Sequence, residues 1–126
     1  MGGGNSSTEK DLVPFIVYSN AETCKTDILK ENKGKSGVYR WVNLETGKSY
    51  IGSAINLKER FVNYYNLNHL KGNDSMLICR TLLKYGYSKF RLEILEYCDS
   101  EVRFEATQRK LLFNIIFSWI QYIKKS

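Results

Sequence analysis

The chain has 126 residues, which is enough for one domain with a single hydrophobic core and too few for two full cores. Its 19 lysines and arginines outnumber 13 acidic residues and give a net charge of +6, an excess typical of proteins that bind polyanions such as nucleic acids. The three cysteines have no close paired spacing and only one histidine accompanies them, which argues against a disulfide framework or a structural zinc site and favours a reducing intracellular compartment.

Residues 1–36 are predicted to form a flexible leader and an N-terminal arm. Met1–Asp11 is polar and glycine-rich, so it cannot bury enough apolar surface to fold, and it carries no secretory signal. The opening residues also fit the short pattern for N-myristoylation, which flexible leaders match easily. Leu12–Tyr18 is a β-prone run beside the only proline, which predicts an edge strand or an extended arm. Asn20, or the serine before it, then predicts the start of a helix that runs through Asn32.

Residues 37–99 are predicted to form the core, which opens with a β-hairpin. Val38–Asn43 and Lys48–Gly52 are rich in β-branched and aromatic residues and flank a short connection that ends at a glycine suited to a left-handed turn. Side chains two residues apart in a strand share a face. We therefore expect Tyr39 and Trp41 to point to one side of the first strand, and Tyr50 to share a side of the second strand with Gly52.

Two helices are expected to follow the hairpin. Asn56 is a good N-cap for a helix over Leu57–Leu67. Asp74 or Ser75 is expected to cap a second helix, Met76–Tyr85, which the next glycine ends. The residues of this second helix that are expected to face inward are Ile78, Cys79, Leu82 and Leu83.

The third strand is predicted at Phe90–Tyr97, where apolar and polar residues alternate. These elements predict a mixed α+β fold with a small three-stranded antiparallel sheet flanked by helices. Residues 100–126 predict a diverged C-terminal amphipathic helix. Its strongly apolar part, residues 111–123, is too short to span a bilayer, so a docking helix is favoured over a membrane-associated one and no stable membrane insertion is expected.

Two tripeptides and an arginine carry the strongest functional signal. Gly37-Val38-Tyr39 is followed after ten residues by Tyr50-Ile51-Gly52, and Arg60 comes eight residues later. This pattern resembles the GIY-YIG endonuclease family, from whose first motif it differs only by valine in place of isoleucine. Further segments, up to residue 96, resemble in particular the homing endonucleases encoded in fungal mitochondrial group I introns. The resemblance implies a nuclease that hydrolyses phosphodiester bonds in double-stranded DNA, and a mitochondrial location.

The resemblance also implies roles for individual residues. Tyr39 and Tyr50 would position or activate the attacking water, and Arg60 would bind the scissile phosphate. A free tyrosine has a pKa near 10, so a tyrosine base needs neighbouring cations or a metal to act at neutral pH. Tyr64 lies one helical turn after Arg60, where this family often carries another polar aromatic residue.

Glycines and basic residues complete the implied site. Gly37 and Gly52 would shape the backbone, with Gly52 letting the chain approach closely. Four basic side chains are candidates for contacts with DNA phosphates that do not depend on base sequence. These candidates are Arg40, Lys48, Lys58 and Lys84.

The family binds one Mg²⁺ or Mn²⁺ through an acidic residue on the helix after the third strand, typically the second glutamate of a Glu-x-Glu pair. Here Glu105 aligns with the first of the pair, and Thr107 occupies the metal-binding position. Glu105 is therefore a metal-ligand candidate, although a solvated helix residue explains it as well. Two alternatives stay open: a weakened or inactive DNA-binding remnant that lacks the metal-binding glutamate, and a membrane- or partner-docked helix protein that retains the fold.

Overall fold

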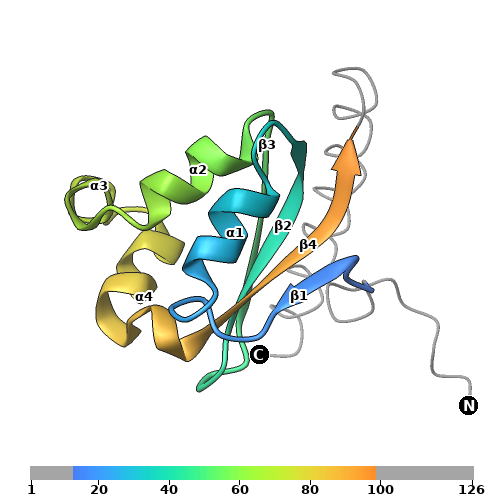
Figure 1. Cartoon of the computed structure of the whole chain (residues 1–126). Coiled ribbons are helices and arrows are strands. Elements are labelled where there is room, and N and C mark those ends of the chain that lie inside the picture. The colour runs from blue at the N-terminus through green and yellow to red at the C-terminus, as the bar shows by residue number, and fades with distance from the viewer. Residues whose placement is uncertain (1–12, 99–126) are drawn as a thin grey trace, which may run out of the picture.

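A four-stranded antiparallel sheet of order β1-β4-β2-β3 forms the centre of the computed structural model, which describes residues 13–98 (Figure 1). Its strands are β1 (Ile16–Tyr18), β2 (Ser36–Asn43), β3 (Ser49–Ala54) and β4 (Phe90–Cys98). The helices, which lie to one side of the sheet, are α1 (Lys25–Glu31), α2 (Leu57–Tyr64), α3 (Leu67–Gly72) and α4 (Leu77–Tyr85). The mixed α+β class is confirmed, whereas the predicted count of three strands is wrong.

The fourth strand is β1, which lies at the edge of the sheet beside β4. Phe15 N–H donates to the Ile94 carbonyl over 2.7 Å, and Val17 pairs with Glu93 in the register. Tyr18 is buried while Val17 stays 49% exposed, as the alternation of a strand requires. The edge strand predicted beside the proline is confirmed, and it pairs with a strand more than seventy residues away in the chain.

Asn32 joins the N-terminal elements to the sheet. It is fully buried, and its Nδ2 donates to the Ile28 carbonyl over 2.7 Å and to the Tyr18 hydroxyl over 3.2 Å. Its Oδ1 accepts a hydrogen bond from the Tyr97 hydroxyl over 2.6 Å. β1, the end of α1 and β4 therefore share one polar contact, and the packed unit begins upstream of Gly37.

We expect Asn32→Ala to lower the free energy of unfolding by about 2–4 kcal/mol, because it deletes buried hydrogen bonds and leaves the Tyr97 hydroxyl without its acceptor. Urea denaturation measures this change. Asn68→Ala, at an exposed position of α3, is the matched control and is expected to stay within about 0.5 kcal/mol of wild type. Equal stability of the two variants would contradict the linking role of Asn32.

The β2–β3 hairpin places the predicted aromatic residues on the helix-facing side of the sheet. Tyr39 pairs with Gly52 and Trp41 pairs with Tyr50, and the connecting Gly47 has φ = 78°. Trp41 is fully buried, with ring centroids 5.4 Å from Tyr64 and 6.0 Å from Phe90. The predicted hairpin and its shared face are both confirmed.

The first predicted helix after the hairpin is divided in two. Asn56 caps α2 as expected, because its Oδ1 accepts from the Glu59 N–H over 3.1 Å. α2 ends at Tyr64, however, and Asn66 caps the separate helix α3 by accepting from the His69 N–H over 3.1 Å. Two asparagine caps ten residues apart thus replace the single helix predicted to reach Leu67.

The helix predicted at Met76–Tyr85 is present as α4. Its N-cap is Met76, without a side-chain hydrogen bond, so the predicted capping by an aspartate or serine is wrong. Leu83, predicted to face inward, is 36% exposed, and Gly86 ends the helix with φ = 85°. A 3₁₀ turn, η3 (Tyr87–Lys89), then leads into β4.

Two further expectations concern the cysteines and the membrane. All three cysteines are free thiols, and Cys79 and Cys98 are buried. Among residues 13–98, no helix combines the length and apolar character needed to cross a bilayer. The helix predicted over residues 100–126 lies outside the described residues.

Candidate active site

Tyr39 is the innermost residue of the candidate site. Its side chain is 1% exposed and projects from β2 towards the helices. The Phe61 ring meets it edge-on at a centroid distance of 5.2 Å, and the Tyr64 ring does so at 6.0 Å. Because α2 holds the phenol ring on this side, the ring has one well-defined position against the neighbouring strand.

Gly52 supplies the space that the Tyr39 phenol occupies. A Cβ added at Gly52 would lie 2.5 Å from the Tyr39 hydroxyl oxygen and 2.6 Å from Cζ, closer than packed atoms approach each other. Gly37 is equally restricted, because an added Cβ would collide with the Glu96 carbonyl oxygen. Both glycines of the motif thus permit close approaches, at a side chain for Gly52 and at the backbone of β4 for Gly37.

Arg60 and Tyr64 bring two further predicted residues to the same hydroxyl. Arg60 Nη1 donates to the Tyr39 hydroxyl over 3.3 Å and to the Ser53 carbonyl over 3.1 Å. The Tyr64 hydroxyl, one turn further along α2, lies 3.0 Å from the Tyr39 hydroxyl. Arg60 is exposed whereas both tyrosines are buried, so the cation is the part of this cluster that meets solvent.

Sequence reasoning missed the two groups that fix the cluster in place. One is the Ser53 carbonyl, a backbone group at the end of β3 that no side-chain pattern reveals. The other is the contact of the Phe61 ring with the Tyr39 ring, because helical spacing indicates only that Phe61 faces inward. The position of Phe61 directly after Arg60, on the buried face of α2, is the signal that identifies it.

The environment fixes the charges of the cluster. Burial, followed by the neighbouring Tyr39 hydroxyl, raises the pKa of Tyr64 far above its ordinary value of 10.0. Burial alone would lower the pKa of Arg60, but the phenol oxygens of Tyr39 and Tyr64 outweigh it and raise that pKa. Near neutral pH, Tyr64 is therefore a neutral hydroxyl and Arg60 is a cation, an arrangement suited to an anionic ligand.

The raised pKa of Tyr64 predicts a loss of stability in alkali. Below the unfolded-state pKa of 10.0, Tyr64 is neutral in both states and its full contribution to stability is present. Above that pH the unfolded chain deprotonates more readily than the folded protein, so this contribution is lost. We expect the thermal midpoint to fall above about pH 10. In Tyr64→Phe we expect the thermal midpoint to fall less steeply with pH, since one titrating group has been removed. Melting curves between pH 8 and 11 measure both slopes, and identical slopes would contradict the assignment.

Tyr50 lies on the same face of the sheet as Tyr39, one inward-facing position along β3 from Gly52. Its side chain is half-buried and packs against the edge of the core. The sheet thus presents both tyrosines of the motif on its helix-facing side. Of the two, Tyr50 is the more accessible to solvent.

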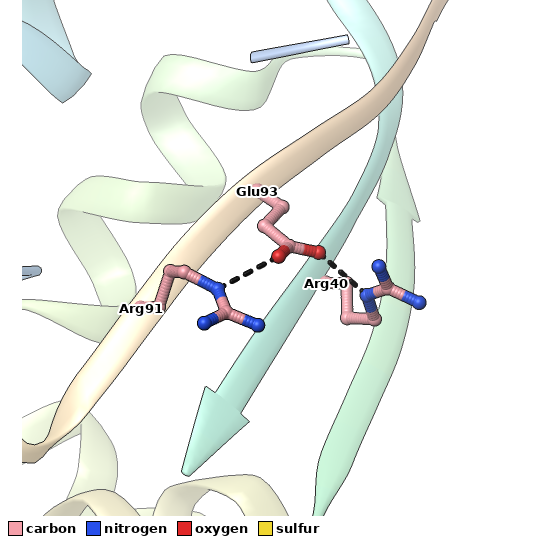
Figure 2. A network of polar contacts seen from close by, with 3 residues as sticks. All are labelled: Arg40, Arg91 and Glu93. Carbon is pink, nitrogen blue, oxygen red and sulfur yellow. Dashed lines mark hydrogen bonds and ion pairs between the residues drawn. The ribbon is translucent and has the colours of Figure 1, made fainter. Parts of the chain in front are cut away.

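Arg40 projects from the opposite face of the sheet. Its Nε pairs with Glu93 Oε1 at 2.6 Å, and Glu93 Oε2 accepts from Arg91 Nε at 2.8 Å (Figure 2). Arg40 and Glu93 are buried, with 6% and 3% of their surface exposed. The structure does not bring Arg40 to the Tyr39 cluster, and its predicted DNA contact gains no support from this position.

The three lysines predicted to contact DNA are spread over the surface. Lys48 is exposed directly before β3, and Lys84 is exposed on α4, 5.3 Å from the centre of the Tyr85 ring. Lys58 lies in the first turn of α2, the helix that carries Arg60. Of the three, only Lys58 shares an element with the cluster.

The described part of the site does not fit a divalent metal by itself. Within residues 13–98 no group of three or more histidine, cysteine, aspartate or glutamate side chains is arranged to hold an ion. Tyr39, Tyr64 and Arg60 supply two hydroxyls and a cation, whereas Mg²⁺ and Mn²⁺ favour carboxylate oxygens. The candidate ligand Glu105 and the substituted position Thr107 lie outside the described residues.

Comparisons with known proteins agree with this geometry. The family model of the GIY-YIG catalytic domain matches residues 35–111. "Probable intron-encoded endonuclease 1" of Neurospora crassa is 30% identical over 103 residues, which cover 77% of this chain and 32% of that protein. The chain thus spans about a third of the length of this relative. No solved structure matches the chain at comparable significance. With Tyr39, Gly52 and Arg60 of the motif meeting at one hydroxyl, the chain belongs to the GIY-YIG family.

Proposed function

We propose that the chain is a DNA endonuclease domain that hydrolyses phosphodiester bonds. The observation that carries the proposal is the contact of exposed Arg60 with buried Tyr39, at the positions that define the family. The basic charge of the chain supports a polyanionic substrate. The name of the Neurospora relative, an intron-encoded endonuclease, supports an origin in intron homing.

Arg60 is the group proposed to bind the scissile phosphate. A guanidinium has five N–H donors, and the contacts with Tyr39 and Ser53 use only Nη1. The Tyr64 hydroxyl also contacts the guanidinium. The donors of this exposed side chain that face solvent are proposed to pair with two phosphate oxygens in a forked, charge-assisted contact. As negative charge builds up on these oxygens during hydrolysis, a cation already fixed in place stabilises it without reorganisation.

The tyrosines are proposed to hold the arginine and the attacking water. The Tyr39 oxygen accepts a hydrogen bond from Arg60, and the hydroxyls of Tyr39 and neutral Tyr64 are hydrogen-bonded to each other. These hydrogen bonds hold the guanidinium in place on the side that faces the sheet. The water-positioning role implied for Tyr39 and Tyr50 remains part of the proposal, and Tyr50 is the better placed to meet solvent because it is half-buried.

A divalent metal, Mg²⁺ or Mn²⁺, is also part of the proposal, with Glu105 as the candidate ligand in this chain. Homing of a mitochondrial group I intron is proposed as the biological setting.

The second candidate function is a DNA-binding remnant without catalysis. It is favoured by Thr107, which stands where the family has its metal-binding glutamate.

Nicking of a supercoiled plasmid separates the two functions. For an active enzyme we expect nicking by wild type with Mg²⁺ or Mn²⁺, its loss in EDTA, and a decrease of about 10²-fold in Tyr50→Phe. For a remnant, wild type binds DNA without nicking it and Thr107→Glu gains metal-dependent nicking. A chain that neither nicks nor binds DNA in any of these forms contradicts both functions.

A further inference from the structure

A groove lined by lysines lies between α1 and α2, away from the Tyr39 cluster. It has a volume of ≈ 420 Å³. We call it the lysine groove, and its lining residues are Lys25, Thr26, Leu29, Lys30, Lys33 and Lys58. No acidic side chain contributes to this lining, so four cationic side chains, from α1, the turn after it and α2, line one hollow.

The sequence of α1 and the turn after it separates the two signs of charge. At about 100° per residue, the lining residues from Lys25 to Lys30 occupy one face of the helix, and Lys33 follows in the turn after it. Ile28 and Asn32 are buried in the core. Asp27 and Glu31 project to another side, where Glu31 accepts a hydrogen bond from the Tyr18 hydroxyl over 2.8 Å. The acids of α1 are thus directed away from the groove.

Among residues 13–98, the cationic side chains of the groove have no acidic partner. Within the described part of the chain, no carboxylate lies within ion-pair distance of Lys30, Lys33 or Lys58. The Lys25 ammonium lies 5.3 Å from the centre of the Tyr65 ring. This cation–π contact stabilises the positive charge less than an ion pair with a carboxylate would. Mutual repulsion in such a cluster is relieved by mobile counterions, and a polyanion that displaces those counterions binds with a gain in entropy.

We propose that the lysine groove binds the sugar-phosphate backbone of the DNA substrate, apart from the phosphate held by Arg60. The proposal rests on the proposed function. Lys25 and Lys30 are about 7–8 Å apart along the axis of α1, a length over which one strand of a duplex rises by about two phosphates. Contacts of this kind are made without reading base sequence.

The position of the groove relative to Arg60 suits a duplex. Lys58 and Arg60 are two residues apart and project from opposite flanks of α2, a helix roughly 10 Å across with its side chains. This width is comparable to the roughly 12 Å of a DNA major groove. A duplex lying over α2 therefore has one backbone at Arg60 and another at the lysine groove.

The test uses Lys30→Gln/Lys33→Gln on the full chain, with Lys71→Gln/Arg80→Gln as a control that removes two exposed charges from α3 and α4. Fluorescence anisotropy with a 30-base-pair duplex measures Kd from 50 to 300 mM salt. We expect the groove variant to bind roughly tenfold more weakly and to lower the slope of log K against log salt by about two. The control is expected to stay within about twofold of wild type.

Plasmid nicking and vesicle binding complete the test. One outcome is that the groove variant binds DNA with the same affinity and salt slope as wild type while wild type nicks the plasmid. This result would overturn the lysine groove as a DNA site and would leave the proposed function unaffected. Loss of binding to phosphatidylserine vesicles with DNA affinity unchanged would also overturn it, in favour of a membrane surface. Absence of both DNA binding and nicking in wild type overturns the groove together with the proposed function.

Discussion

Replacing Arg60 with alanine is expected to lower the rate of plasmid nicking by about 10³-fold. The variant removes the guanidinium that faces solvent and leaves the Tyr39 and Tyr64 hydroxyls paired with each other. Because an exposed side chain contributes little to stability, the free energy of unfolding is expected to change by less than about 1 kcal/mol. Single-turnover nicking and urea denaturation measure the two effects separately.

Arg60→Lys and Arg80→Ala are the informative companions of this variant. Lysine keeps the charge but cannot form a forked pair with phosphate, so we expect it to recover only part of the lost rate. Arg80 is exposed on α4, and its replacement is expected to leave the rate at the wild-type value. Full activity in Arg60→Ala would remove Arg60 from the site, whatever the lysine variant does.

The second large effect is expected at Gly52. In Gly52→Ala the new methyl group meets the Tyr39 hydroxyl and Cζ at 2.5 and 2.6 Å, and the packed ring of Phe61 limits how far the phenol can move aside. Displacing Tyr39 breaks its contacts with Arg60 and Tyr64. We expect nicking to fall by at least about 10²-fold, and stability to fall by about 1–3 kcal/mol.

Gly72→Ala is the matched control, because a Cβ added there meets nothing within 4 Å. Gly72 is the last residue of α3, where alanine is tolerated better than glycine. We expect stability and nicking rate to equal or exceed those of wild type. If Gly52→Ala behaves like Gly72→Ala, the close approach of Tyr39 to β3 is not needed for activity.

The parts of the fold that were predictable depend on local chemistry. Gly47 and Gly86 carry the positive φ values that a hairpin and a helix end require, and both positions are read directly from the sequence. Asn56 was recognisable as an N-cap in the same way. The opposition of Tyr39 and Gly52 follows from the hairpin register once the turn is placed.

The parts that were not predictable depend on distant residues. β1 forms because Phe15 meets Ile94, and Arg40 is buried because Glu93 lies opposite it in the sheet. Neither partner is near in sequence. The local pattern therefore indicates an edge strand or arm without its partner strand in the first case, and a surface cation in the second. The burial of Tyr39 is also not predictable from the local sequence, since it requires α2 to pack on β2 and β3.

The most direct test of the account is the rate at which the wild-type chain converts supercoiled plasmid to open circles with Mg²⁺ or Mn²⁺, measured beside Arg60→Ala. The account predicts metal-dependent nicking by wild type that EDTA abolishes and that Arg60→Ala lowers by about 10³-fold. Equal rates for wild type, Arg60→Ala and a blank without protein would contradict it.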